Sequence, residues 1–289
     1  MSQLTVSIVN YNAGDYLLGT LESLMLVSNE MKMDITVVDN SSTDDSIKQA
    51  QLKFPNIKYI LNKENVGFGR AHNQVIRNVK SKYILILNPD MVVKEGAIKE
   101  CLRYMEDHGD VGAVTPKIIF EDGRVDMTAH RGFPTPWASL LYFLGDDSLY
   151  HLSKIKINQP HEVDAITGAF FFTSKEVLEK VGVFDEDYFM FAEDIDLCFR
   201  IKKAGLKIVY LPNVQVVHFK GISSGLKKQT QEQSAADLET KKRSLNYFYE
   251  TMKTFYKKHL EKKYPFFINW LVYLGIDLRW WLARRKLTV

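Results

Sequence analysis

The sequence contains few cysteines and no recognisable leader, and both facts narrow its class. Its 289 residues include only two cysteines, Cys101 and Cys198, each on the apolar face of a predicted helix. This number argues against a disulfide-stapled fold and indicates buried, free thiols in a reducing compartment. Met1-Ser2-Gln3 leads straight into an apolar strand, without a basic n-region or a long apolar h-region. The sequence therefore predicts no secretory signal and a cytoplasmic protein.

Long hydrophobic runs are also missing. The stretch 264–286 is interrupted by Asp277 and Arg279, whereas a membrane span needs about 20 largely apolar residues. Three of the four tryptophans lie in this stretch and basic residues flank it, which predicts a helix lying in the headgroup region of a membrane. The alternative is a helix that packs on its own domain or across a homodimer. We expect a peripheral position on the inner face of the cell membrane.

Charge is distributed unevenly along the chain. Hydrophobic residues make up 46% and charged residues 25% of the sequence, as in ordinary globular proteins. The net charge of +3 hides a strongly basic segment, because residues 241–289 hold 12 Lys and Arg against three acidic residues. We expect a globular domain at residues 1–225, a basic, aromatic helical region at residues 226–289, and no nucleic-acid partner.

Four strand-then-helix units run from residue 4 to about residue 110. The predicted strands are Leu4–Val9, Ile35–Val38, Ile57–Leu61 and Tyr83–Leu87, and each is followed by apolar residues at helical spacing. This alternation predicts an α/β fold with a parallel, doubly wound sheet. The fold alone does not settle the ligand.

Shorter elements follow in the second half. We expect a hairpin at residues 117–127, a long loop region at residues 128–162 and a helix that opens at Glu193 and ends at Gly205. Further predicted elements are a strand at 163–173 that is interrupted at Thr167-Gly168, a helix at Lys175–Val181, and strands at Ile208–Leu211 and Val214–His218. A flexible connection at 219–240 and a polar helix from about Gln233 to Leu260 complete the prediction.

Asp90 stands at the carboxyl end of a predicted inner strand. The apolar run Tyr83–Leu87 stops at Asn88-Pro89-Asp90, and ligands of open α/β sheets bind at this edge. Asp90 is either a metal or diphosphate ligand or a cap of the helix that begins near Glu95. As a ligand of Mg²⁺ or Mn²⁺ it needs few protein partners, because phosphate and water complete the shell. His218, at the end of a strand, is either the second ligand or a structural histidine.

Adjacent acids open the helix at residue 193. Glu193 and Asp194 either cap the helix through its macrodipole or supply a general base that accepts a proton from an attacking hydroxyl. We favour Asp194 as the base, with Glu193 second. Asp196 is a third acid of this helix, and Arg200 is expected to pair with an acid and orient the helix.

Polar residues after the first three strands suit a nucleotide. Asp39 either accepts the imide N–H of uracil or thymine or caps the next helix, and Tyr11 is placed to stack on the base. Gly67-Phe68-Gly69 lacks the third glycine of a dinucleotide fingerprint and follows the third strand. A glycine turn near a diphosphate, with Arg70 reaching towards it, fits better.

Five segments together resemble a family 2 glycosyltransferase, most closely its bacterial rhamnosyltransferase branch. They are Val6–Asn12, Val37–Asp44, Asn65–Asn73, Leu87–Asp90 and Phe191–Arg200. The resemblance implies the GT-A fold, a Rossmann-like mixed sheet with helices on both faces, here followed by a C-terminal helical extension. It also implies an inverting transfer to a hydroxyl of a lipid-linked or cell-surface polysaccharide, with dTDP-rhamnose as the leading donor.

The same resemblance implies roles for individual residues. Asp90 matches the last Asp of the Asp-X-Asp metal motif, Asp194 matches the catalytic base, and Asn88 departs from the motif's first Asp, which leaves less negative charge for Mg²⁺ or Mn²⁺. The nucleotide-binding positions implied are Tyr11, Asn12, Asp39, Asn65, Gly67, Arg70 and Asn88, and the positions that either contact the acceptor or orient the site are Gly168, Asp196 and Arg200.

Three other readings share these residues. A nucleotidyltransferase should carry a Gly-rich, basic loop after its first strand, and Asn10–Gly14 has none. A glycosyltransferase using a UDP- or GDP-linked sugar has the same fold. A non-catalytic, membrane-associated sugar-nucleotide binder would bind the donor without turnover.

Overall fold

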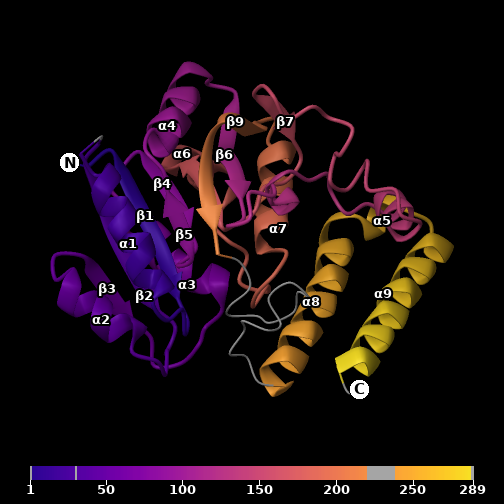
Figure 1. The fold of residues 1–289 in the computed structure, drawn as a ribbon. Coiled ribbons are helices and arrows are strands. Elements are labelled where there is room, and N and C mark those ends of the chain that lie inside the picture. Colours follow the sequence, from indigo (N-terminus) through magenta and orange to yellow (C-terminus); the bar gives the residue numbers. More distant parts are fainter. Residues whose placement is uncertain (1, 30, 220–237, 288–289) are drawn as a thin grey trace.

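A mixed sheet forms the centre of the molecule (Figure 1). The computed structural model describes residues 2–29, 31–219 and 238–287. Within these ranges nine strands form one sheet in the order β3-β2-β1-β4-β8-β6-β9-β5, and β7 pairs with β9 outside this path.

The first four predicted strands are present and run parallel. They are β1 (Leu4–Asn10), β2 (Met33–Asp39), β3 (Lys58–Leu61) and β4 (Tyr83–Leu87). The helices after the first three strands are α1 (Tyr16–Val27), α2 (Ser46–Lys53) and α3 (Phe68–Ile76). After β4 the chain forms a short strand that the sequence did not indicate, β5 (Met91–Val93), and then α4 (Ala97–Asp107).

The alternating direction of the side chains along a strand determines which helix covers which face of the sheet. Ile8 of β1 belongs to the same buried cluster as Leu17 of α1, whereas its neighbour Val9 clusters with Val75 of α3. Successive side chains of a strand point to opposite faces. Helices α1 and α3 therefore cover opposite faces of the sheet.

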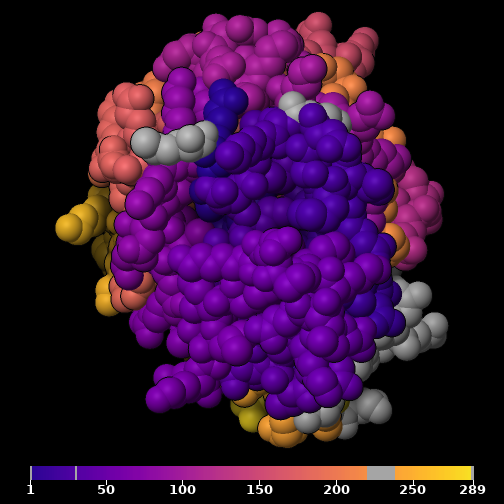
Figure 2. Space-filling view, turned by 90° about the vertical axis from the view of Figure 1, so that its left-hand side faces the viewer, coloured from indigo at the N-terminus to yellow at the C-terminus, as the bar shows by residue number. Residues whose placement is uncertain are grey.

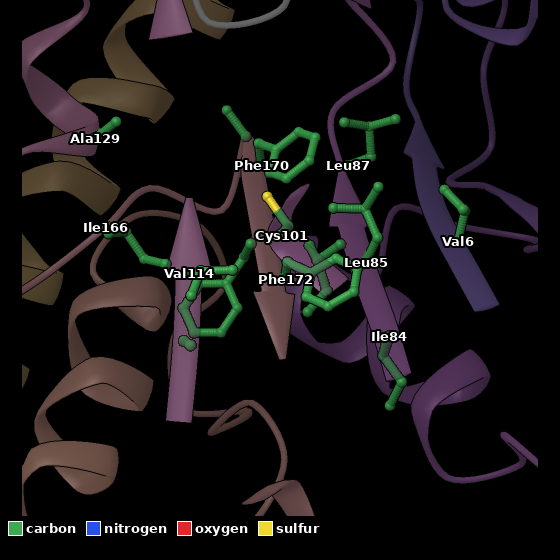
Figure 3. Packing of buried hydrophobic residues seen from close by; sticks show 14 of the residues in the cluster. Val6, Ile84, Leu85, Leu87, Cys101, Val114, Ala129, Ile166, Phe170 and Phe172 are labelled. Carbon is green, nitrogen blue, oxygen red and sulfur yellow. The ribbon is translucent and has the colours of Figure 1, made fainter. Parts of the chain in front are cut away.

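The antiparallel strand β8 (Phe170–Ser174) joins the parallel half of the sheet to the rest. It pairs with β4 on one side, where Phe172 lies opposite Leu85, and with β6 (Val111–Ile119) on the other. Figure 3 shows Phe170 and Phe172 between the side chains of these neighbouring strands. Because these aromatic residues are fully buried, both halves of the sheet share one hydrophobic core.

The two predicted final strands are one strand, β9 (Lys207–His218). Its pairing with β6 shifts register between Pro116 and Lys117, and Pro212 lies on the bulged side. Proline is tolerated at such a bulge because the hydrogen-bond ladder between the strands is interrupted there. The N–H group that proline lacks is therefore not needed for pairing. The prediction of two strands was wrong because a bulge and a turn have the same local sequence signal.

The helices before β9 lie where the sequence predicts them. They are α6 (Lys175–Val181), capped by the side chain of Ser174, and α7 (Glu193–Lys203). The predicted hairpin at 117–127 is reduced to a turn, in which Phe120 N donates to Arg124 O at 2.8 Å. A single bridge between Ile119 and Val125 follows.

The predicted loop region at residues 128–162 contains a helix, α5 (Pro136–Phe143). Thr135 caps it by accepting a hydrogen bond from Ala138 N at 3.2 Å, and Pro136 occupies its first turn. The helix has no regular apolar period, because its sequence is apolar on nearly every side. The same segment includes η1 (Met127–Ala129) and β7 (His161–Val163).

The first C-terminal helix, α8 (Leu238–His259), is part of the main core. Phe255, Tyr256 and Leu260 are buried in the principal hydrophobic cluster. The expected start of this helix near residue 233 and the expected domain boundary between residues 225 and 226 lie outside the described residues. Removing α8 would therefore expose core that the rest of the domain covers.

The last helix, α9 (Phe266–Leu287), lies against α8 and is mostly exposed. It follows η2 (Glu261–Lys263), and Ile276 is its one buried residue. Within residues 2–29, 31–219 and 238–287 no helix is long and apolar enough to cross a membrane. Figure 2 shows the side of the molecule made by the N-terminal part of the chain, where the orange and yellow C-terminal helices appear only at the edges.

Candidate active site

The strand registers bring the candidate residues to one edge of the sheet. Asn10 pairs with Asp39 across β1 and β2, Ile8 pairs with Leu87 across β1 and β4, and Leu87 pairs with Phe170 across β4 and β8. The carboxyl ends of β1, β2 and β4 therefore meet the amino end of β8. This is the edge at which ligands of open α/β sheets bind.

Asp39 is a buried carboxylate that shapes the loop after β2. Its Oδ1 accepts hydrogen bonds from Asn10 Nδ2 at 2.8 Å and from Ser42 Oγ at 2.6 Å, and its Oδ2 accepts one from Ser42 N at 3.0 Å. Asn12, with φ of 51°, accepts from Thr43 N at 2.7 Å and ties the loops after β1 and β2 together. Half-buried Tyr11 precedes Asn12 in the same loop.

Gly67 makes a contact that only glycine allows. Its φ is 89°, and a Cβ at this position would lie 2.3 Å from the carbonyl oxygen of Phe189. The turn is held by Asn65 Oδ1, which accepts from Gly67 N at 2.9 Å. Phe68 N then donates to Phe189 O at 2.9 Å. The glycine turn is thus joined to the segment that leads into α7.

Arg70 is directed to an acid of the protein itself. Its Nε lies 3.2 Å from Glu186 Oε2, and about half of the side chain is exposed. The expectation that Arg70 reaches towards a diphosphate is not what this arrangement favours, because the guanidinium already has a charged partner.

Asp90 is brought to His218 by the pairing of β5 with β9. Met91 lies opposite His218 in this pair, and Asp90 Oδ1 is 3.3 Å from His218 Nε2. The other ring nitrogen, Nδ1, is 3.3 Å from Asp126 Oδ2. Burial lowers the pKa of His218, but the two carboxylates outweigh this effect, so that the pKa is raised.

Asp90 and His218, supported by Asp126, fit a divalent cation whose other ligands come from a bound phosphate group and from water. Asp90 Oδ1 is buried, and His218 Nε2 is the one polar partner shown for it in the described part of the chain; a buried carboxylate oxygen with so few donors suits a cation. A carboxylate behind the imidazole, here Asp126, is the usual support of a metal-binding histidine. No group of three or more potential ligands occurs among residues 2–29, 31–219 and 238–287. Asp90 and His218 would therefore need phosphate oxygens and water to complete the shell.

Asn88 connects the metal-binding and acid-rich parts of this edge. Its backbone N donates to Ala169 O at 3.0 Å, and the residue before Ala169, Gly168, donates from its backbone N to Asp194 Oδ2 at 3.0 Å. A short chain of hydrogen bonds thus leads from the strand end that carries Asp90 to Asp194. Both carboxylates lie on the same edge of the sheet.

Asp194 has a cationic partner. Arg131 Nη2 lies 3.2 Å from Asp194 Oδ2, and both side chains are largely buried. A Cβ at Gly168 would lie 3.0 Å from the Phe68 ring and 3.8 Å from Asp194 Cβ. The carboxylate of Asp194 therefore sits in a closely packed corner made by Gly168, Phe68 and Arg131.

Glu193 is in a different electrostatic state from its neighbour. It is buried, and its Oε2 has no hydrogen-bond partner among the described residues. Burial, together with the adjacent charge of Asp194, raises the pKa of Glu193 to about 8. At neutral pH Glu193 is therefore mainly protonated, and a protonated carboxyl is unsuited to accept a proton.

Asp196 and Arg200 hold α7 in place. Arg200 Nε donates to the buried Asp196 Oδ2 at 2.8 Å, and its Nη1 and Nη2 donate to the carbonyls of residues 181–183. Asp196 Oδ1 also lies 2.6 Å from His259 Nε2 of α8. These contacts fix the helix that carries Asp194 against two other parts of the chain.

A comparison with known families identifies the chain. The sequence profile described as Glycosyl transferase family 2 matches residues 5–182, more than half of the chain. The chain belongs to glycosyltransferase family 2. It is thus a glycosyltransferase, as the motifs predict.

Two curated relatives are rhamnosyltransferases by name. This glycosyltransferase is 28% identical over 240 residues to the N-acetylglucosaminyl-diphospho-decaprenol L-rhamnosyltransferase of Mycobacterium tuberculosis, covering 77% of this chain and 78% of that protein. It is 29% identical over 223 residues to rhamnosyltransferase WbbL of Escherichia coli, covering 74% of this chain and 82% of that protein.

Solved structures confirm the fold class. GalNAc-T7 with UDP, GalNAc and Mn²⁺ aligns with a TM-score of 0.58 at 17% identity, over 75% of this chain and 43% of that one. TarS of S. aureus in complex with UDP-GlcNAc aligns with a TM-score of 0.53 at 15% identity, over 84% of this chain and 64% of that one. The glycosyltransferase thus has the predicted GT-A fold and spans less than two thirds of either solved chain.

Sequence reasoning missed two residues of the glycosyltransferase site, Arg131 and Asp126. Arg131 lies 63 positions before Asp194, and Asp126 lies 92 positions before His218. Both fall where the strand and helix periodicity is weak, so no local pattern marked them. Each is buried, and a buried charge is seldom left without a partner.

Proposed function

We propose that this enzyme transfers a sugar with inversion, rhamnose from dTDP-rhamnose, onto a hydroxyl of a lipid-linked or cell-surface polysaccharide acceptor. The observation that carries the proposal is the similarity to two rhamnosyltransferases over about three quarters of the chain. The geometry supports it, because Asp39, Asn88, Asp90 and Asp194 converge on one sheet edge.

The donor would lie along the ends of β1, β2 and β4. Asp39 Oδ2 accepts a single hydrogen bond from the described residues, so it can also accept the imide N–H of thymine. Tyr11 and Asn12 stand at the end of the neighbouring strand. The turn at Asn65 and Gly67 closes this region against the segment before α7. The diphosphate would then point towards Asn88 and Asp90.

The reaction would occur between Asp90 and Asp194. Asp194 accepts the proton of the acceptor hydroxyl, whose oxygen forms a bond to the anomeric carbon. The bond from that carbon to the diphosphate oxygen breaks, and a single displacement inverts the anomeric configuration. Arg131 and the Gly168 N–H hold the Asp194 carboxylate in position.

Mg²⁺ or Mn²⁺ is the cofactor that suits Asp90 and His218. When bound it would offset the negative charge that builds on the departing nucleoside diphosphate. Asp126 orients the imidazole of His218 for that task. The neutral Asn88 contributes less charge than an aspartate, so the diphosphate supplies more of the attraction for the metal.

A panel of nucleotide sugars tests the donor. We expect dTDP-rhamnose to be hydrolysed or transferred at least about tenfold faster than UDP-GlcNAc, UDP-galactose or GDP-mannose, because the base and sugar pockets discriminate by fit. Release of nucleoside diphosphate measures turnover, and product linkage determined by NMR measures inversion. Faster use of a UDP- or GDP-linked sugar, or retention of configuration, would contradict the proposal.

We further propose that α9 and α5 form the membrane-facing surface of the enzyme. Seven of the exposed apolar residues of α9 recur at helical spacing; they are Phe267, Trp270, Leu271, Leu274, Leu278, Trp281 and Leu282. Arg279 Cζ of α9 lies 4.0 Å from the centre of the Phe143 ring of α5, so the two helices are in contact at this point. Basic residues follow in the last turn of α9, as anionic lipids require.

Substitutions in α9 test this membrane-facing surface. A truncation that removes the C-terminal helices is unsuitable, because it would also remove α8, which is part of the core. The triple variant Phe267→Ser, Trp270→Ser, Leu274→Ser should bind anionic vesicles at least about tenfold more weakly, since each exposed apolar side chain contributes to insertion. Leu26→Ser with Leu52→Ser, which also removes exposed apolar groups, is the matched control. Unchanged vesicle binding by the triple variant, with loss of a dimer in light scattering, would favour the dimer interface instead.

A further inference from the structure

Two histidine rings meet next to Arg131, outside the donor site. His130 is buried and directly precedes Arg131, and the partly buried His161 is the first residue of β7. The Nε2 atoms of the two rings are 2.6 Å apart, close enough for a hydrogen bond. Neither ring takes part in the proposed proton transfer from the acceptor. A buried contact between two basic groups requires a physical explanation.

The outer nitrogen of each ring faces a backbone carbonyl. His130 Nδ1 is 2.9 Å from His151 O, and His161 Nδ1 is 2.8 Å from Gln159 O. A carbonyl oxygen only accepts hydrogen bonds, so each Nδ1 carries a proton. Because a neutral imidazole holds a single ring proton, two neutral rings would direct the lone pairs of their Nε2 atoms at each other. The three contacts therefore require three protons, and two neutral rings supply two.

A metal ion between the rings would need a wider gap. Zn²⁺ binds imidazole nitrogen at about 2.0–2.1 Å in a tetrahedral shell, so two such nitrogens lie about 3.3 Å apart. The observed separation of the Nε2 atoms is shorter, at 2.6 Å. No group of three or more potential His, Cys, Asp or Glu ligands occurs in the described part of the chain. A proton therefore fits the gap between the two rings better than a metal ion.

The surroundings of the pair favour one positive charge and oppose two. The centre of the Tyr210 ring lies 5.1 Å from that of His130 and 5.5 Å from that of His161, within the range at which an aromatic ring attracts a cation. Burial and the charge of Asp126 raise the pKa of Tyr210, so the phenol stays neutral. Burial lowers the pKa of His130, and positive charge on His161 or His151 lowers it further. A second proton on the pair is therefore disfavoured.

The other charged groups near the pair are paired with one another. Glu162 and Asp164, which follow His161 in the chain, both pair with Lys202 of α7. The His151 ring nitrogen Nδ1 lies 3.4 Å from Asp147 Oδ2. Among the described residues no carboxylate contacts either ring of the pair. The proton between the rings is therefore held by imidazole nitrogens alone, and we expect it to titrate as histidine does, between about pH 5 and 8.

The pair is joined to Asp194 through two neighbouring segments of the chain. Arg131 N donates to Ala165 O at 3.2 Å, and Ala165 N donates to Arg131 O at 2.9 Å, four residues after His161. Arg131 Nη2 then lies 3.2 Å from Asp194 Oδ2, and Gly168 N donates to the same oxygen at 3.0 Å. The two segments thus carry the histidine pair at one end and both donors to Asp194 at the other.

We propose that His130 and His161 share one proton and act as positioning residues for Arg131 and, through it, for Asp194. The proposal rests on the proposed function, in which Asp194 is the base. When the pH rises, the shared proton passes to water and the two Nε2 lone pairs repel each other. The segments at 130–131 and 161–165 then move apart, and the donors to Asp194 lose their alignment. Turnover should fall on the basic side while the donor still binds.

Nitrogen NMR of the full chain, labelled with ¹⁵N-histidine, counts the ring protons without turnover. At pH 6 we expect a proton on each Nδ1 of the pair and a third proton shared by the two Nε2 atoms, which is lost as the pH rises. His161→Gln identifies the signals of the pair among the seven histidines. Only two ring protons on the pair at pH 6 would overturn the proposal. Binding of Zn²⁺ by the wild type that His161→Gln abolishes would overturn it as well.

Turnover measured against pH tests the positioning role. His161→Gln supplies a permanent donor, because the glutamine amide N–H reaches about the position of Nε2 and does not titrate. Between pH 6 and pH 8.5 the kcat of the wild type should fall about 10- to 100-fold, as for a misplaced catalytic group, and that of His161→Gln less than about threefold. His161→Leu, which cannot donate, should turn over slowly at both pH values. The affinity for dTDP should be the same in all three proteins.

Two further variants separate the pair from other titrating groups. His151→Gln keeps the backbone carbonyl that His130 contacts and should have the wild-type pH profile. The basic loss should also persist in Glu193→Gln, which removes a group whose pKa is about 8. A flat profile in either variant, or a His161→Gln profile that matches the wild type, overturns the proposal. Absence of transfer by the wild type would refute the proposed function, while the NMR measurement would still decide the protonation of the pair.

Discussion

Asp194→Asn is expected to lower turnover by about 10²- to 10⁴-fold while donor binding stays intact, as is typical when a general base is removed. The amide keeps the size of the carboxyl group, and its oxygen can still accept from Arg131 and Gly168, which bond Asp194 Oδ2 in the wild type. The loss would therefore reflect proton transfer and not misfolding. Steady-state transfer to acceptor and calorimetric binding of dTDP measure the two quantities separately.

Glu193→Gln is the matched control for this prediction. Because the pKa of Glu193 is raised to about 8, its side chain is mainly neutral at pH 7, and glutamine reproduces that state. The variant should transfer sugar at nearly the wild-type rate. A large loss in Glu193→Gln together with normal turnover in Asp194→Asn would reverse the assignment of the base.

The protonation state of Glu193 can be checked through stability. Between its ordinary pKa of 4.5 in the unfolded chain and about 8 in the folded one, the folded state binds the additional proton. The free energy of unfolding contributed by this group therefore falls as the pH rises through that window. Urea denaturation should show Glu193→Gln gaining stability relative to wild type from pH 5 to pH 8. No such gain would mean that Glu193 is ionised in the fold.

Asp90→Asn is expected to reduce kcat/KM by about 10²- to 10³-fold, because it removes the charged ligand that would hold Mg²⁺ or Mn²⁺ beside the diphosphate. The variant should also lose the increase in dTDP affinity that Mn²⁺ produces, which calorimetry measures without catalysis. Activity that is equal in Mn²⁺ and in EDTA, in wild type and variant alike, would exclude this role for Asp90.

Asp126→Asn tests whether Asp126 supports His218 in the proposed metal site. Since Asp126 contacts His218 and not Asp90, the variant should weaken metal affinity about 10- to 100-fold, with turnover recovering at saturating Mn²⁺. Asp122→Asn is the matched control, because Asp122 is an exposed acid of the same turn that pairs with Arg124. Identical effects of both substitutions would show that the turn, and not the carboxylate, matters.

Several elements of the fold followed from local sequence signals. The apolar runs that form β1, β2, β3 and β4 were recognisable because buried parallel strands are nearly continuous in apolar residues. Helix α7 was recognisable from its acidic first turn and from Gly205 after its end. The helix α5 and the single long strand β9 were not, because an all-apolar helix has no period and a bulge resembles a turn.

The properties of the site also fall into those that the sequence indicated and those that only the tertiary structure showed. The sequence by itself indicated that Asp39 and Asp90 follow strands that end at one edge of the sheet, because parallel strands of an α/β fold end on the same side. It placed Asp194 only at the start of a helix, and the hydrogen bond from Gly168 N located it at that edge. Only the tertiary structure decided that burial beside Asp194 raises the pKa of Glu193, that Arg131 and Asp126 contact Asp194 and His218, and that Arg70 is paired with Glu186. These properties depend on burial and on contacts between residues far apart in the chain, and neither is encoded in a local pattern.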